Sequence, residues 1–223
     1  MSEPTIYKPS IYKGAGVYKI EGSGGGEYIP GTEVIGGKTY KTTLIGSQTW
    51  LSENLDLKWD GLEIGARDTY TDAVAAYYLN DELTYGWNGR KYGLLYNGTA
   101  HKYLIDNADT LTPGWHIPTN DEFQELKNFI DNYCDAVLLR DGSNYWYDNC
   151  RGFDLYGFAA KPSGDWESGS FRYEGQDCML RSSTLFNSTD YSLWLNYYSY
   201  TDFRKQDAHA QLNRFFSIRL IKD

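Results

Sequence analysis

The sequence has little positive charge and no long apolar run. Lys and Arg number 21 against 30 Asp and Glu, which gives a formal net charge of −9 and a pI near 4.8. A surface of this sign repels the phosphates of nucleic acids and anionic membrane surfaces. Apolar stretches of the length that a membrane span requires are absent. We therefore expect no nucleic-acid partner and no membrane insertion.

Cysteine is scarce, and its spacing does not suggest a zinc site. The three residues are Cys134, Cys150 and Cys178, with no CxxC or Cys/His motif among them. An odd number leaves at least one thiol unpaired within a chain. The sequence leaves open a bridge from Cys150 to either of the others, or three reduced thiols.

Catalytic motifs are also missing. The chain contains no HExxH, GxSxG, GxGxxG or P-loop pattern. Its three histidines, His101, His116 and His209, are scattered, and we interpret His116 as a structural residue with satisfied hydrogen bonds. The sequence thus predicts a protein that is not an enzyme and that needs no cofactor.

The N-terminal part is punctuated by Gly and Pro and lacks a secretory signal pattern. Residues 22–26 (GSGGG) form a flexible joint, so we predict an arm or connector over residues 1–36 and one domain over residues 37–223. The arm's role is open between a tether, an oligomerisation strand and a leader without fixed structure. A homo-oligomer is therefore one expectation. Localisation is open between virion-associated, cytoplasmic, and surface-exposed after removal of a leader.

Local patterns from residue 38 onward predict a mixture of strands and helices. Residues 38–45 (KTYKTTLI) and 48–51 (QTWL) flank Gly46-Ser47 and are typical of a hairpin. Residues 73–79 (AVAAYYL) suggest a short helix. Asn97-Gly-Thr and Asn187-Ser-Thr match the glycosylation pattern, which we interpret as chance without a secretory signal.

The strongest helix signal lies in the middle of the chain. Thr119 followed by Glu122 forms a capping box, and Phe123, Leu126 and Ile130 recur at helical spacing. We predict a helix over about residues 120–133. Helices at one end of the sequence and short strands at the other indicate an α+β fold.

Aromatic residues are what the chain has in excess, at 17% with 21 Tyr. They crowd residues 182–223, together with Ser, Asn and Asp, a composition typical of binding surfaces. The final residues then alternate, with Phe216, Ile218 and Leu220 set against Ser217, Arg219 and Ile221, as in strands that close a fold.

A strand over residues 193–200 would place Leu193, Leu195 and Tyr197 on a core face and the remaining aromatics on the other. The predicted ligand-binding face continues down the chain, and its members are Trp194, Asn196, Tyr198, Tyr200, Asp202, Arg204, Asp207, His209, Asn213 and Phe215. The competing interpretation is that these aromatics stack on each other or against the arm at a subunit contact.

Several segments match one family in order. They are residues 45–50 (IGSQTW), 53–55 (ENL), 92–96 (YGLLY), 113–118 (PGWHIP) leading into 121–123 and Leu126, 156–158 (YGF) with Pro162 and Gly164, 181–184 (RSST) and 216–219 (FSIR). Over roughly residues 38–223 the chain resembles the Fibrobacter succinogenes major paralogous domain, common in Bacteroidetes and their phages. The resemblance implies a C-type lectin-like fold, with short antiparallel strands, about two helices and C-terminal strands that form the ligand-binding face. Trp50 and Trp115 would then be core aromatics.

The chain departs from this family between residues 184 and 216, where aromatic and charged residues replace small polar ones. Phe215, for example, stands where the family tends to have Gly. In similar lectin-like proteins diversified by retroelements, this region is the hypervariable ligand-binding surface. The resemblance thus implies a non-enzymatic, receptor-binding or adhesin-like protein with a protein or glycan ligand on a cell or phage target. The alternative is a structural or oligomerisation module of a surface or virion assembly.

Two other activities of lectin-like proteins are less well supported. Formylglycine-generating enzymes need a cysteine pair that the chain does not match. Calcium-dependent lectins use Glu-Pro-Asn or Gln-Pro-Asp with Trp-Asn-Asp, and none of these tripeptides occurs. Asp148, Asp202 and Asp207 remain carboxylates that can hold a cation, although we predict no metal site.

Overall fold

The computed structural model has an α+β architecture with three helices and several sheets among its described residues. The structure describes residues 10–14, 17–21, 27–69, 71–76, 92–130, 139–142, 145–147, 152–186, 191–197, 203–206 and 212–223. The expected α+β class is confirmed, while the expectation of about two helices is wrong by one. None of the described helices has the length and apolar character needed to cross a membrane.

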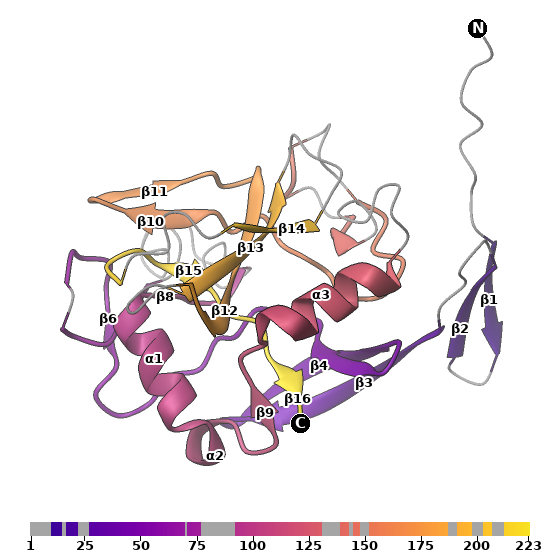
Figure 1. Cartoon of the computed structure of the whole chain (residues 1–223), viewed down its shortest axis with the longest axis horizontal. Helices are drawn as coiled ribbons and strands as arrows, with labels where there is room; N and C mark the ends of the chain where they lie inside the picture. Colours follow the sequence, from indigo (N-terminus) through magenta and orange to yellow (C-terminus); the bar gives the residue numbers. More distant parts are fainter. Residues whose placement is uncertain are drawn as a thin grey trace, which may run out of the picture.

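The first sheet has seven antiparallel strands in the order β1-β2-β3-β4-β5-β16-β9. They are β1 (Ser10–Gly14), β2 (Val17–Glu21), β3 (Glu27–Ile35), β4 (Lys38–Ile45), β5 (Gln48–Leu51), β9 (Trp115–His116) and β16 (Ile221–Lys222). In Figure 1, β1 and β2 lie beside the end of β3 and away from the helices. The last strand of the chain therefore lies in the same sheet as the first.

The second sheet also has seven strands, in the order β14-β13-β12-β15-β8-β7-β6. They are β6 (Glu63–Ile64), β7 (Val74–Ala76), β8 (Leu95–Tyr96), β12 (Asp177–Leu185), β13 (Tyr191–Tyr197), β14 (Phe203–Gln206) and β15 (Phe216–Ser217). Most neighbours are antiparallel, and β12–β15 and β6–β7 are parallel. A separate hairpin pairs β10 (Asp165–Glu167) with β11 (Ser170–Arg172).

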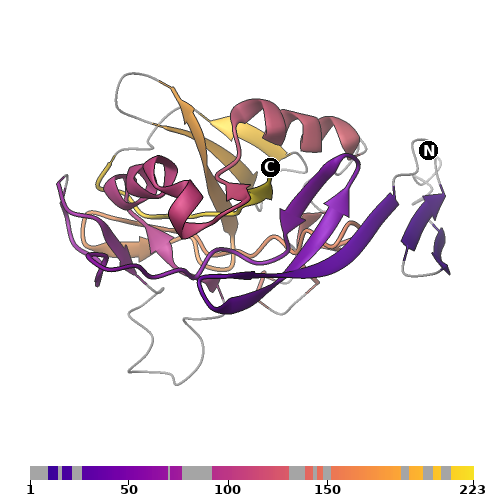
Figure 2. The same ribbon diagram turned by 90° about the horizontal axis from the view of Figure 1, so that it is seen from below.

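The helices are α1 (Gly98–Asp106), α2 (Ala108–Leu111) and α3 (Asn120–Phe129). Figure 2 shows α1 and α3 on one side of the molecule and β3 on the other. The predicted hairpin is confirmed as β4–β5, which turns at Gly46 with a φ of 60°. The predicted boundary at residues 36/37 falls in the turn between β3 and β4, and β3 pairs with β4 along its length. Strands before this boundary therefore belong to the first sheet, which starts with β1 at Ser10.

Helix α3 starts as the sequence predicts. The Thr119 side chain accepts a hydrogen bond from the Glu122 backbone N–H, and the Glu122 carboxylate accepts from the Thr119 backbone N–H at 2.7 Å. Burial raises the pKa of Glu122, but the hydrogen bonds from Thr119 together with His116 outweigh it, so the pKa lies below its ordinary value. The helix ends at Phe129, and residues 131–133 of the prediction lie outside the described part of the chain.

Two local predictions between residues 70 and 110 need correction. The helix expected over residues 73–79 is wrong within the described residues, because Val74–Ala76 form strand β7 between β6 and β8. Pairing with two neighbouring strands overrides the helix propensity of alanine, because tertiary contacts outweigh local propensity. Helix α1 had not been predicted. Its N-cap is Asn97, fully buried, whose side chain accepts a hydrogen bond from Ala100 N–H at 2.8 Å.

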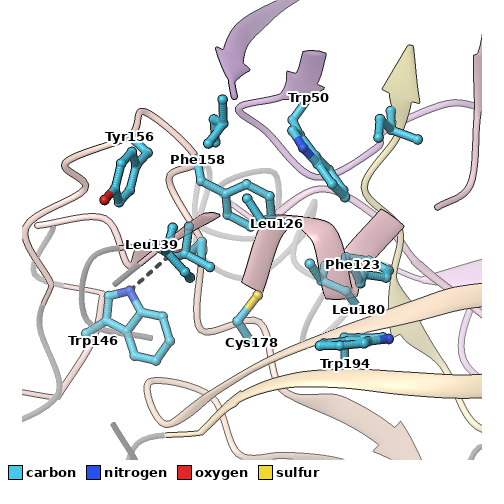
Figure 3. Close-up of a cluster of buried hydrophobic side chains, with 14 residues drawn as sticks. Trp50, Phe123, Leu126, Leu139, Trp146, Tyr156, Phe158, Cys178, Leu180 and Trp194 are labelled. Carbon is cyan, nitrogen blue, oxygen red and sulfur yellow. Dashed lines mark hydrogen bonds between the residues drawn. The ribbon is translucent and has the colours of Figure 1, made fainter. Parts of the chain in front are cut away.

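Aromatic rings link one core cluster from helix α3 to both sheets (Figure 3). Trp50 packs against Phe123 and Phe158 with ring centroids 5.4 and 5.5 Å apart. The confirmed core aromatics Trp50 and Trp115 are 0% and 2% exposed. Buried aromatic rings of this size contribute more to the stability of the core than smaller side chains do.

The C-terminal residues run from one sheet to the other, since β15 belongs to the second sheet and β16 to the first. Between them, Ile218, Arg219 and Leu220 are each 0% exposed. The alternation of residues 216–221 therefore does not separate a core face from an exposed face. Both sets are buried because this segment has a packed sheet on either side.

Candidate functional site

The candidate site is the C-terminal segment, defined as residues 186–215, and its N-terminal end is fixed to the start of helix α3. Ser183 N–H donates to the Pro118 carbonyl at 2.8 Å. The Asn120 N–H donates to Thr184 Oγ1 at 2.9 Å. Strand β12 thus leaves the core from a rigid position immediately before the segment begins.

The other end of the segment is fixed by Phe215. Phe215 and Trp166 exchange both backbone hydrogen bonds, at 3.0 and 3.2 Å, and their rings meet edge-on with centroids 5.0 Å apart. Phe215 is 0% exposed. Its predicted place on an exposed ligand-binding face is therefore wrong, because the β10–β11 hairpin covers it.

Charged residues fix the two positions before Phe215. Arg214 bonds Asp165, and its Nε lies 3.2 Å from Glu167 Oε1. Asn213 is 7% exposed, and its Nδ2 donates to Asp68 Oδ1 at 3.3 Å. The predicted exposure of Asn213 is also wrong, because this hydrogen bond turns the amide into the protein.

The structure contradicts the predicted place of Trp194 on the ligand-binding face most clearly. It is 1% exposed, its ring stacks on Phe123 with centroids 5.4 Å apart, and its Nε1 donates to Asn120 Oδ1 at 3.0 Å (Figure 3). Helix α3 therefore covers the face of β13 that carries Trp194. The alternation of side chains along β13 separates two faces of the strand. Which of these faces is buried depends on where α3 packs.

The remaining predicted residues fall on the least described part of the chain. Asn196 pairs in register with Phe203, and Arg204 pairs with Leu195, so the backbones of β13 and β14 place these positions side by side. The other members lie outside the described residues: Tyr198, Tyr200, Asp202, Asp207 and His209. Their place on the predicted face stays a prediction.

Exposed apolar side chains lie where the segment begins. Leu185 is 50% exposed and Phe186 is 52% exposed, at the end of β12. Strand β14 is the last strand of the second sheet at this edge, and its Lys205 is exposed. Adjacent exposed apolar residues are typical of interaction surfaces, and Leu185 and Phe186 lie where β12 ends, two strands in from the edge strand β14.

His116 is a satisfied structural residue, as predicted. Its Nδ1 lies 2.5 Å from Asp223 Oδ1, and its Nε2 lies 2.8 Å from Glu122 Oε1. Within the described ranges, no group of three His, Cys, Asp or Glu residues is arranged to hold a metal. The carboxylates Asp148, Asp202 and Asp207 lie outside those ranges.

Cys178 is a free, buried thiol, so the Cys150–Cys178 bridge is not formed. Burial raises the pKa of Cys178 to about 11. A thiol in this state is a poor nucleophile and behaves as a small apolar side chain. Cys134 and Cys150 lie outside the described residues.

Arg219 is a buried residue that the sequence interpretation did not single out. Its Nη2 donates to Asn54 Oδ1 at 2.6 Å, and its guanidinium also donates to the backbone carbonyls of Leu51, Phe158 and Ala159. Burial lowers its pKa to about 10. In the sequence, only the position of Arg219 directly after residues 216–218 (FSI) points to its burial. Its hydrogen-bond acceptors could not be predicted, because they lie on segments that are distant in the sequence.

Comparison with known proteins identifies the family. The profile of the Fibrobacter succinogenes major domain matches residues 44–222. The chain belongs to this family. No curated protein and no solved structure gives a significant match. Family segments quoted from the sequence form buried parts of the scaffold, and this includes Trp50, Trp115, Phe158 and Arg219.

Proposed function

We propose that this member of the Fibrobacter succinogenes major domain family is a non-enzymatic ligand-binding protein with a C-type lectin-like fold. It recognises a protein or glycan on a cell or phage target in the manner of a receptor-binding protein or adhesin. The C-terminal segment supplies the contacts. Its Tyr, Asn, Asp and Arg residues provide rigid contact area and adaptable hydrogen bonds.

One observation carries the proposal. The pair Leu185 and Phe186 is about half exposed at the point where the chain leaves a hydrogen-bonded scaffold, and Phe215 returns it to that scaffold. A segment held at both ends by buried contacts presents its side chains without a large ordering cost. The exposed apolar side chains of Leu185 and Phe186 beside this segment provide contact area for a ligand.

Diversification by a retroelement is the second part of the proposal. The residue types between the scaffold ends are those that randomised adenine-rich codons supply, and the family resemblance points the same way. A reverse transcriptase gene and a template repeat matching the 3′ end of this gene are expected next to it. A complete genomic neighbourhood without them would reject this part.

An oligomerisation module is the second candidate, and one observation favours it. The β1–β2 hairpin adds two strands to the first sheet, and β1 is the edge strand of that sheet. Edge strands can pair with another copy of the chain. Light scattering of the full chain decides whether the protein is an oligomer, and a monomer at micromolar concentration would reject this candidate.

The binding proposal is tested with arrays of glycans and cell-surface proteins and two double variants, Tyr198→Ala/Tyr200→Ala and Leu185→Ser/Phe186→Ser. Both should lose binding to the ligand found with the unaltered chain. The matched control is Ile64→Ser, which is 48% exposed on the opposite edge strand of the same sheet and should bind normally. Unchanged binding by both double variants would move the site away from this segment.

A further inference from the structure

A cavity of about 560 Å³ opens on the scaffold, away from the C-terminal segment. Four parts of the chain line it: β3–β4, residues 52–54, residues 92–93 and residues 154–161. No residue of 186–215 is among the described residues of its wall. Its volume is within the range of small-molecule sites.

Three lysines line this cavity, and carboxylates neutralise two of them. Lys38, Lys41 and Lys161 line it, together with the carboxylates of Glu53 and Asp154. Lys161 Nζ lies 2.7 Å from Asp141 Oδ2, and Lys38 Nζ lies 3.4 Å from Asp56 Oδ2. Within the described ranges, the Lys41 ammonium makes no such contact, so it is available to an anionic group.

Several neutral and acidic oxygens in the wall have unused hydrogen-bonding capacity. The hydroxyls of Thr42 and Ser52 have no hydrogen-bond partner among the residues that the structure places. Asp154 Oδ1 accepts the Ala159 N–H at 2.7 Å, which leaves Oδ2 as a second acceptor. Two hydroxyls and a carboxylate oxygen suit a ligand that carries several hydroxyl groups.

The backbone of the wall is strained at the same place. Asp154 and Ala159 have φ values of 43° and 49°, in the left-handed region that L-residues other than Gly, Asn and Asp rarely adopt. Non-glycine residues in this region persist where the surrounding structure holds them, often at ligand sites. The unusual residue is therefore Ala159, whose N–H is the one that donates to the Asp154 carboxylate in the cavity wall.

We infer that this cavity binds a sugar acid, with Lys41 holding its acidic group and with Asp154, Thr42 and Ser52 holding its hydroxyls. The inference concerns a second site and does not rest on the proposed function of the C-terminal segment. The chemistry is that of a uronic or sialic acid, either free or at the end of a glycan. A neutral sugar would leave Lys41 unused, and a simple anion would leave the hydroxyl partners unused.

Asp154 supplies an independent signature. Burial raises its pKa to about 6, against the opposing effect of Arg219 and Lys161 and with a further rise from Asp141. A raised pKa means that the fold favours the protonated carboxyl, so the cost in stability builds up above the ordinary pKa of 3.8 and is complete above a pH of about 6. Asp154→Asn should therefore raise the thermal unfolding midpoint at pH 8, and the gain should shrink toward pH 4.

Calorimetric titration of the full chain tests the site with D-glucuronate, D-galacturonate and N-acetylneuraminate, and with D-glucose and acetate as matched half-ligands. At least one sugar acid should bind about tenfold more tightly than either half-ligand. Lys41→Gln and Asp154→Asn should each weaken that binding about tenfold. Lys102→Gln, an exposed lysine on α1, should leave it unchanged.

Two results would overturn the inference: equal binding of sugar acids and half-ligands, or full binding by both cavity variants. The methyl glycoside of the sugar acid that binds identifies the source. Equal affinity of the glycoside assigns the site to the end of a glycan, and its exclusion assigns the site to the free acid.

Discussion

Replacing Trp194 by Ala decides whether this residue belongs to the core or to a binding surface. The ring is 1% exposed, stacks on Phe123 and donates to Asn120. Truncating a buried Trp to Ala costs about 3–5 kcal/mol through lost contacts and the cavity that remains. For a chain of this size, that loss lowers the unfolding temperature by about 6–20 °C.

Thermal and urea unfolding followed by far-UV circular dichroism measure this loss. Trp194→Phe keeps an aromatic ring against Phe123 but removes the N–H donor, so it should cost about 1–3 kcal/mol. Phe153→Ala is the surface control, since Phe153 is 71% exposed, and should change stability by less than about 0.5 kcal/mol. Wild-type stability of Trp194→Ala, combined with lost ligand binding, would refute the core assignment and restore Trp194 to the ligand face.

Three further predictions concern the scaffold. Cys178 should react with a thiol reagent at pH 8 only after unfolding, because burial raises its pKa to about 11. Mass spectrometry locates the modification, and a modified Cys178 in the folded chain would contradict its burial. Thr119→Ala should cost about 1 kcal/mol in urea unfolding. This loss should shrink as the pH falls through the lowered folded pKa of Glu122, because protonation of its carboxylate then weakens its part of the capping box. Gly164→Ala should cost more than about 1 kcal/mol, since its Cβ would lie 1.9 Å from a carbonyl oxygen of β11, whereas Gly61→Ala carries only the cost of its φ of 88° and should be milder.

The sequence was most informative where structure depends on neighbouring residues. The β4–β5 hairpin and the start of α3 follow from alternation, a Gly turn and a capping box, all within a few residues. Helix α1 carried a comparable signal in Asn97, with Ala100 and Leu104 at helical spacing behind it. The glycosylation-like pattern Asn97-Gly-Thr overlaps this N-cap in the sequence.

Features that depend on distant segments could not be predicted. Residues 74–76 form a strand because β6 and β8 lie on either side, which no local propensity reveals. Arg219 has its hydrogen-bond acceptors on residues 51, 54, 158 and 159, and the cavity is lined by segments that range from residue 30 to residue 161. A sequence does not show whether a basic residue is buried or exposed, because its burial depends on the partners that folding brings to it.

Burial also limits which positions of the C-terminal segment can vary. A polar replacement at Trp194 or Phe215 would leave a cavity next to Phe123 or Trp166 and endanger the fold. Asn213 is held by Asp68 and tolerates little change of shape. If a retroelement diversifies this gene, its variable codons should therefore avoid 194, 213 and 215 and fall between them. Template adenines spread evenly over the three buried positions would contradict this division, because most resulting variants would lose the scaffold that presents the surface.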